Sequence, residues 1–463
     1  MKFYNTIHRR EENFTPLVEG KVGLYTCGPT VYDYAHIGNF RAYIFEDLLR
    51  RFLESSGYQV THVMNITDID DKTIRRAREQ GLSLQTFTDK YIQAFHDDIS
   101  TLNIHPAHHY PRATEFVPQM IDMIKMLDEK GFAYALDDGS VFFKVAQFSQ
   151  YGQLANLNPD QLRIGNRVVN DEYDKEEVRD FALWKGAKAN EEGVYWESPW
   201  GRGRPGWHIE CSVMSMHYLG THFDIHCGGV DNIFPHHENE IAQSCAATGD
   251  QFVNYWLHNE HLMVDGEKMA KSADNFYTQR DLLDRDLTPE AIRYTLLTTH
   301  YRQKLNFTFE KVSAAQKSIN RLRELQRRLE QMDKHTAEPG PDSCGKVWQD
   351  FMTVLGDDLN ISGALGILFT WVNEQFALLD AKTMSRSSAK NALLLLSQID
   401  QMLGVIAVLD TNLDDEIQDL IDQRNQARKD CNWAEADRIR DHLKGCGIIL
   451  EDTSGGTIWK RSS

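Results

Sequence analysis

The stretch VGLYTCGPTVYDYAHIGN, from residue 22 to residue 39, decides the fold class. Its first six residues form an apolar run typical of a buried strand, and Gly28 and Pro29 then interrupt regular structure. Apolar side chains recur at helical spacing from Phe40 to Phe52. The predicted order is therefore strand, loop and helix, with Cys27 at the end of the strand.

A second strand follows the same plan. Residues 60–66 are mostly apolar and lead into an acidic run, which includes Asp68 and Asp70, where a helix can begin. Alternating strands and helices predict a parallel sheet with helices on both faces, and such sheets bind ligands at the C-terminal ends of their strands. We therefore expect an α/β, Rossmann-like domain with Cys27 and Asp68 at its ligand-binding edge.

The rest of the chain departs from this pattern in three places. Residues 113–200 read as one helix, over 114–130, and a β-hairpin around Gly139, before strand-like residues 223–226 and a helix over 236–247 resume the first theme. An apolar stripe with helical period begins near Val312 and predicts a bundle. The expected domains are a Rossmann-like domain split into 1–112 and 201–255, an inserted α+β subdomain at 113–200, a lysine-loop region at 256–307, a helical bundle at 308–410 and a small C-terminal α/β unit at 411–463.

Composition excludes several classes of protein. The 463 residues are 41% hydrophobic and 25% charged, as in folded globular proteins, and the net charge of −18 argues against indiscriminate binding of nucleic acid. The apolar runs are shorter than the ~20 residues of a membrane helix, and the charged N-terminal residues do not resemble a secretory signal. Seven scattered cysteines are too few for a disulfide framework. We expect a cytoplasmic protein with reduced thiols and no membrane span.

Two short motifs point to a nucleotide. His36-Ile37-Gly38-Asn39 lies where a loop enters a helix, a position that favours phosphate, and Lys268-Met269-Ala270-Lys271-Ser272 follows a hairpin turn. Taken singly, the histidine could be a helix cap and the lysines a solvated pair. Together and in this order, the two motifs resemble the HIGH and KMSKS signatures of class I aminoacyl-tRNA synthetases.

A second constellation offers metal ligands. Cys27, Cys211, His236 and Glu240 provide two thiolates, one imidazole and one carboxylate, a set that suits zinc better than magnesium or calcium. Buried cysteines are also common as small apolar side chains, so the residue types alone leave both interpretations open. Other side chains could orient the ligands or the substrate, namely His208, His226, His237 and Glu238.

Four segments resemble the cysteinyl-tRNA synthetase family, and the resemblance extends over the whole chain. They are residues 26–33, 65–72, 204–212 and 234–240. The resemblance implies an enzyme that activates L-cysteine with ATP and Mg²⁺ and transfers it to tRNA-Cys. It also implies one Zn²⁺ per chain on Cys27, Cys211, His236 and Glu240, which selects the substrate thiolate over a hydroxyl.

The same resemblance assigns the other site residues. His36 and Asn39 would contact the ATP phosphates, Gly38 would admit adenine, and Lys268 and Lys271 would stabilise the phosphates during the reaction. The substrate cysteine would meet Thr67, Trp207 and Asp231. The tRNA anticodon would meet Arg428, Trp433, Asp437 and Asp452, and residues 256–307 would contact the tRNA stem.

Two departures from the family motifs leave part of this open. Asn39 replaces a histidine and Ala270 replaces a serine, so charge and proton donation at position 39 are in doubt. The family also implies a monomer. Two alternatives are a cysteine ligase that transfers the adenylate to a small amine acceptor, and a catalytically silent RNA-binding paralogue.

Overall fold

A computed structural model describes residues 1–157, 180–187, 194–269, 275–333, 344–406, 420–428, 432–445, 448–453 and 456–461. The chain divides into two compact units, Met1–Ile406 and Ala407–Ser463. None of the helices in these described segments is long and apolar enough to cross a membrane.

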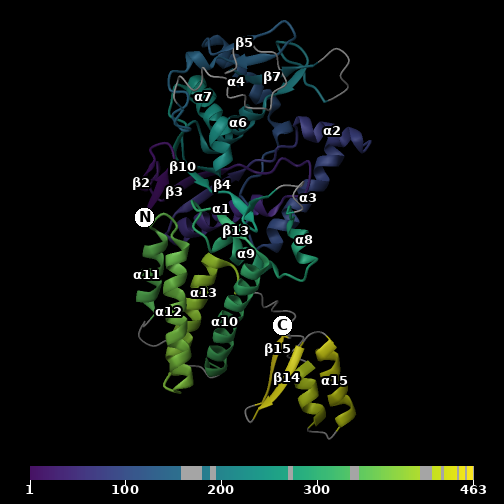
Figure 1. The fold of residues 1–463 in the computed structure, drawn as a ribbon, viewed down its shortest axis with the longest axis vertical. Coiled ribbons are helices and arrows are strands. Elements are labelled where there is room, and N and C mark those ends of the chain that lie inside the picture. The colour runs from purple at the N-terminus through teal and green to yellow at the C-terminus, as the bar shows by residue number, and fades with distance from the viewer. Residues whose placement is uncertain are drawn as a thin grey trace. The chain divides into compact units, whose positions relative to one another are not determined.

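The larger unit is built around a parallel sheet of four strands (Figure 1). Their order is β10 (Val253–Asn259), β9 (Phe223–Gly229), β3 (Lys21–Thr26) and β4 (Gln59–Met64). In β3, Leu24 pairs with Ile225 of β9, and Tyr25 pairs with Val63 of β4. The predicted strands 22–27 and 60–66 are thus confirmed; β3 is central, β4 is its neighbour at the edge of the sheet, and their C-terminal ends lie on the same side.

Helices cover both faces of this sheet. Helix α1 (Ile37–Ser55) packs against β4, β9 and β10, while α6 (Trp207–Leu219) packs against β3 and β4. Helix α1 buries most of its side chains, including Phe40, Ile44 and Phe52. The predicted α/β class with helices on both faces is confirmed.

An antiparallel sheet lies between the two halves of the parallel sheet in sequence. Its strands, in spatial order, are β5 (Ala133–Ala135), β6 (Val141–Phe143), β7 (Phe181–Gly186) and β8 (Gly203–Pro205). The predicted hairpin around Gly139 is therefore correct. The preceding helix is shorter than predicted: residues 113–115 form a 3₁₀ turn, and α4 (Val117–Glu129) begins beside Pro118, a residue favoured in the first helical turn.

Two helices connect β4 to this region, the short α2 (Asp71–Glu79) and the longer α3 (Leu84–Thr101). A small sheet joins β11 (Leu262–Val264), β12 (Glu267–Lys268) and β13 (Leu305–Phe307), with α8 (Gln279–Leu283) and α9 (Pro289–Leu297) between them. At the N-terminus, β1 (Lys2–Asn5) pairs with β2 (Arg10–Asn13).

The described residues of the predicted bundle form helices joined by turns. It comprises α10 (Phe309–Asp333), α11 (Gly345–Leu355), α12 (Ile361–Asp380) and α13 (Arg386–Leu403). The apolar stripe of α10 is wholly buried at Val312, Ile319 and Leu322. Periodicity alone therefore identified the face of α10 that packs into the core.

A buried ionic cluster ties α1 to the bundle. Asp47 of α1 accepts from Arg51 Nε at 2.8 Å and from Arg293 Nη2 of α9 at 2.6 Å, and all three side chains are buried. Arg293 Nε also donates to the carbonyl of Leu403 at the end of α13. The two arginines lower the pKa of Asp47 against the opposing effect of burial, so the carboxylate stays charged.

The smaller unit has its own core. A helix over 420–428 and α15 (Trp433–Gly445) pack with the hairpin of β14 (Ile448–Thr453) and β15 (Gly456–Arg461). Ile421, Ile439, Leu443 and Ile448 are buried together. The helices and the hairpin agree with the small α/β unit that the sequence analysis expected at 411–463.

Candidate active site

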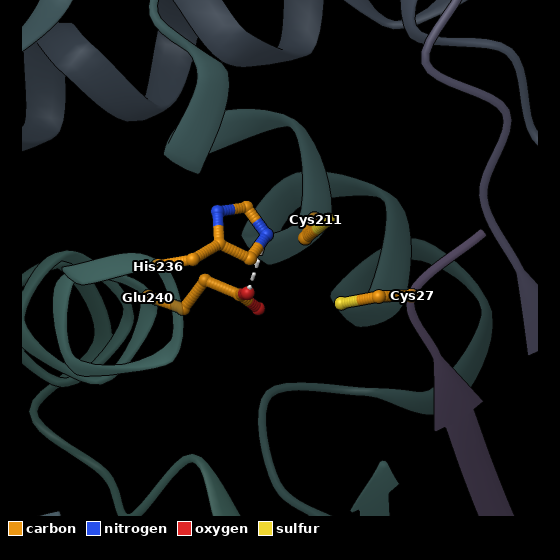
Figure 2. A group of neighbouring side chains, drawn as sticks. All are labelled: Cys27, Cys211, His236 and Glu240. Atoms are coloured by element: carbon orange, nitrogen blue, oxygen red, sulfur yellow. Dashed lines mark ion pairs between the residues drawn. The ribbon is translucent and has the colours of Figure 1, made fainter. Parts of the chain in front are cut away.

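Four side chains from distant parts of the chain converge at the C-terminal edge of the parallel sheet. Cys27 follows β3, Cys211 lies on α6, His236 lies in the kinked segment Ile233–His237, and Glu240 lies on α7 (Glu238–Thr248). One ligand atom from each lies within 4.8 Å of every other (Figure 2). The structure thus brings together the four residues predicted to bind metal.

The backbone is extended at Phe234, with φ −138° and ψ 132°, and is helical at His237 and Glu238, where α7 begins. The predicted helix over 236–247 therefore agrees with the structure to within two residues. His236 and Glu240 face one another, with Nε2 and Oε1 3.1 Å apart. Their spacing of four residues brings the imidazole and the carboxylate to the same side.

The donor set fits a zinc ion. Oε1 of Glu240 is buried and receives no hydrogen bond from any described residue, as expected of an atom that faces a metal position. A hydrogen bond from Cys27, together with the proximity of His236, holds the pKa of Cys211 well below its usual value. Two sulfurs, an imidazole and a carboxylate form a set that zinc accepts and that magnesium and calcium do not prefer.

Further histidines surround this cluster. Nδ1 of His208 lies 2.9 Å from Nδ1 of His236, and Nε2 of His226 lies 3.0 Å from Oε2 of Glu240. His237 lies between Cys27 Sγ, at 3.2 Å, and His258 Nε2, at 2.8 Å. Burial lowers the pKa of both His226 and His258 to about 3, so these rings are neutral.

Three of the four predicted orienting residues therefore touch the cluster. Cys27, His226, His237 and Glu240 also form a second group whose ligand atoms are equally close together. Glu238 points elsewhere, because its carboxylate accepts from the backbone N–H groups of Gly152 and Ala155.

The two nucleotide motifs also meet. His36 caps α1: its Nδ1 accepts from the N–H of Asn39, and the side-chain oxygen of Asn39 accepts from the N–H of His36. A Cβ at Gly38 would lie 2.9 Å from the His36 ring and 3.2 Å from Cε of Met269, so the lysine-rich motif begins beside the helix start. Lys268 is exposed on β12, and Lys271 lies outside the described residues.

Comparison with known proteins agrees with this geometry. A family model of the class I (C) tRNA synthetase catalytic domain matches residues 13–317, and a model of the cysteinyl-tRNA ligase anticodon binding domain matches residues 410–459. A cysteine–tRNA ligase of Brachyspira hyodysenteriae is 50% identical, and one of Chlamydia muridarum is 49% identical, each alignment covering 99% of both chains. The chain belongs to the cysteine–tRNA ligases. The resemblance inferred from the motifs is thereby confirmed.

Solved structures support the fold. A methionyl-tRNA synthetase of Mycobacterium tuberculosis, in complex with methionyl-adenylate, superposes with a TM-score of 0.60 at 16% identity, over 83% of this chain and 90% of the other. The anticodon-domain match at 410–459 removes the basis for a ligase with a small amine acceptor. The full-length relatives likewise favour an active ligase over a silent paralogue.

In this cysteine–tRNA ligase, the predicted substrate residues lie near the four candidate ligands or next to a neighbour of them. Trp207 stacks on His236, with ring centroids 4.1 Å apart, and remains 41% exposed. Asp231 is exposed in the turn before His236 and contributes to raising the pKa of that imidazole, after the larger contributions of Glu240 and Cys211. Thr67 is buried, and its hydroxyl donates to Oε2 of Glu210 at 3.1 Å.

Sequence reasoning missed two residues of this cysteine–tRNA ligase's site. Glu210 immediately precedes Cys211, and its carboxylate accepts a hydrogen bond from Thr67. Its position in the segment 204–212, which resembles the family, could have identified it as a site residue. His258 completes the contact from His237 to Thr6, whose hydroxyl lies 2.8 Å from His258 Nδ1. No local pattern marked His258, because its role depends on the pairing of β10 with β9.

In the smaller unit, the predicted anticodon residues are spread over three elements. Arg428 ends the helix over 420–428, and Trp433 is 59% exposed at the start of α15. Asp437 forms an ion pair with Arg440 at 3.1 Å. Asp452 lies on β14, and its side chain lies outside the described part of the structure.

Proposed function

We propose that this cysteine–tRNA ligase holds one zinc ion on Cys27, Cys211, His236 and Glu240, and that the ion selects L-cysteine. The observation that supports this is the convergence of four such ligand atoms within 4.8 Å at the ligand-binding edge of the sheet. When bound, zinc supplies a strong affinity for a thiolate and a weak one for a neutral hydroxyl, so serine would be rejected without an editing site.

The surrounding residues would position the amino acid. The carboxylate of Asp231 is exposed beside the cluster and carries the charge needed to pair with the substrate ammonium group. Trp207 covers His236 and would exclude water from the bound thiolate. Thr67 would act through Glu210, which its hydroxyl already engages.

ATP would bind with Mg²⁺ between the start of α1 and the lysine-rich motif. The helix N-terminus favours phosphate, Gly38 permits close approach of the base, and Asn39 and His36 shape the helix start. Lys268 and Lys271 would stabilise the charge on the leaving pyrophosphate. An oxygen of the cysteine carboxylate attacks the α-phosphorus and pyrophosphate leaves, and a ribose hydroxyl at the 3′ end of tRNA then attacks the carbonyl and releases AMP.

The C-terminal unit would recognise the anticodon of tRNA-Cys through Arg428, Trp433, Asp437 and Asp452. Its exposed indole can stack on an unpaired base, and its cations can contact phosphates. The domain boundaries given above, a monomeric state and a cytoplasmic location remain predictions that accompany this proposal.

Zinc content and activity test the proposal together. Elemental analysis should find one zinc per chain in the parent protein and none in the Cys27→Ala/Cys211→Ala double variant. Cysteine-dependent exchange of pyrophosphate into ATP should require the same residues, and serine should not support it. Full zinc retention in the double variant, or equal exchange with serine, would contradict the assignment.

A further inference from the structure

We propose that a basic surface on α2 binds the backbone phosphates of the single-stranded 3′ end of the tRNA and guides it to the active site. This α2 surface consists of Lys72, Arg75, Arg76 and Arg78, together with the ring of Tyr32. Four of the nine residues of α2 are cationic, in a chain whose net charge is −18. Because so acidic a protein repels RNA as a whole, RNA binding requires a local concentration of positive charge such as this one.

An aromatic ring holds two of these cations in place. Nζ of Lys72 lies 5.1 Å from the centroid of the Tyr32 ring, and Cζ of Arg76 lies 5.2 Å from the same centroid. Nη1 of Arg76 also donates to the carbonyl of Tyr32 at 3.2 Å and to the carboxylate of Asp33 at 3.0 Å. Such contacts reduce the freedom of long side chains before a ligand arrives, so less conformational entropy is lost on binding.

The anchoring of α2 fixes where these charges lie. At its start, Asp70 caps the helix by accepting from the N–H groups of Lys72 and Thr73. Asp71 is engaged by Lys185 of β7, at 3.1 Å, and by Arg204 of β8. The first turn of α2 is therefore tied to the β5–β8 sheet, the helix packs against α3, and Figure 1 shows it beside α3 below the β5–β8 region.

The remaining charge on α2 is available to a ligand. Lys72, Arg75 and Arg78 are exposed, and within the described segments neither Lys72 nor Arg78 forms an ion pair. Arg75 approaches Glu79 only at 3.9 Å, with both side chains more than 60% exposed. An exposed pair at that distance contributes little, so Arg75 can exchange this partner for a phosphate.

The position of Tyr32 identifies the ligand as the 3′ end of the RNA. Tyr32 belongs to the loop that joins Cys27 to His36, and the bridge between Thr30 and Thr67 holds this loop against the end of β4. The loop therefore connects the proposed thiolate site with the proposed ATP site, and the carbonyl that accepts the tRNA hydroxyl is formed between them. The phosphates of ATP are assigned to the start of α1, which leaves the α2 surface for a second polyanion.

A second tyrosine of the same loop, Tyr34, also lies beside basic side chains. Cζ of Arg280, on α8, lies 4.9 Å from the centroid of the Tyr34 ring, and Nζ of Lys90, on α3, lies 5.9 Å from it. Cations placed beside aromatic rings along one loop are typical of a groove that follows a single strand by its phosphates and bases. This second group extends the basic surface along the loop that leads to His36.

Charge neutralisation at Lys72 is the direct test. In Lys72→Gln, kcat/KM for charging of tRNA should fall at least tenfold, and the slope of log kcat/KM against log salt concentration should become shallower by about 0.7, the value for one phosphate contact on a single strand. Lys72→Arg, which keeps the charge, should restore most of kcat/KM and most of the salt slope. The matched control is Lys125→Gln on α4, an exposed lysine beside Asp122, which should leave charging and its salt dependence as in the parent.

Two further measurements locate the defect. An acceptor-arm minihelix that lacks the anticodon should show the same relative loss for Lys72→Gln, and Tyr32→Leu should weaken charging more than Tyr32→Phe, which keeps the ring. Cysteine-dependent pyrophosphate exchange involves no tRNA and reports the zinc and ATP sites separately. The proposal is overturned by any of three results for Lys72→Gln. Pyrophosphate exchange falls as much as tRNA charging, the minihelix is charged as fast as by the parent protein, or the salt slope of charging equals that of the parent.

Discussion

The variant Glu240→Gln distinguishes two roles of the Glu240 side chain, that of a metal ligand and that of a buried carboxyl which only stabilises the fold. Glu240 is wholly buried, and Oε2 lies 3.0 Å from His226 Nε2. Burial raises the pKa of Glu240 well above its usual value, so the metal-free site favours the neutral carboxyl more than solvent does. Glutamine is neutral and has nearly the same shape. We therefore expect the free energy of unfolding of the zinc-free protein to fall by no more than about 1 kcal/mol, the typical contribution of one hydrogen bond.

The zinc-bound protein should respond differently. At a free zinc concentration 100 times the parent Kd, zinc binding stabilises the folded state by about 2.7 kcal/mol. Changes around metal ligands typically weaken binding 10–100-fold, and loss of a ligand should reach at least the upper value. At the same zinc concentration, a 100-fold weaker site retains only about 0.4 kcal/mol, so the zinc-dependent stabilisation should fall by about 2.3 kcal/mol.

Urea unfolding in zinc buffers and in chelator measures both quantities. Glu46→Gln on α1 is the matched control, because Glu46 is also wholly buried, its pKa is raised to about 8 by burial, and it lies outside the metal cluster. This variant should keep the full zinc-dependent stabilisation. If Glu240→Gln also keeps it, Glu240 is not a ligand; if the zinc-free variant is destabilised as much as the zinc-bound one, the carboxyl is structural.

Three other changes probe the fold, the ATP loop and the smaller unit. Asp47→Asn should lower the free energy of unfolding, measured in urea, by about 3–5 kcal/mol because it leaves buried arginines unpaired. The control Asp357→Asn, in an exposed pair with Lys2, should lower it by less than about 1 kcal/mol. Similar losses in the two variants would refute the role of burial. Lys271→Ala should raise the barrier to pyrophosphate exchange by about 2–4 kcal/mol, and a rate within about twofold of the parent would show that the loop is not catalytic. Deleting residues 411–463 should largely spare exchange and abolish efficient tRNA charging, and Trp433→Ala should weaken charging alone by about 1–3 kcal/mol; equal losses in both assays would assign this unit to stability.

The sequence predicted those parts of the site that depend on local pattern. Strand ends, helix starts and the spacing of His236 and Glu240 are properties of short segments, so the ligand-binding edge of the sheet and the pairing of these two side chains could be inferred. The grouping of His236 and Glu240 with Cys27 and Cys211 as zinc ligands depended on the resemblance to a family. The contacts of His258 and Glu210 could not, because they depend on how β10 pairs with β9 and on how Thr67 approaches α6. The kink at Phe234 before α7 was likewise hidden, since no residue type in 233–237 requires the extended backbone that the structure shows there.

The central position of β3 has a consequence for how the protein is made. Its neighbour β9 follows it by roughly the length of an entire domain: Gly23 and Asp224, which are hydrogen-bonded in the finished sheet, are 201 residues apart. At a translation rate of about 5–20 residues per second, one edge of β3 waits about 10–40 s for its partner. During that time Cys27 has no companion ligand from α6 or α7. A nascent chain would therefore bind the proposed zinc ion late, and Cys27 is most exposed to oxidation or mispairing during synthesis.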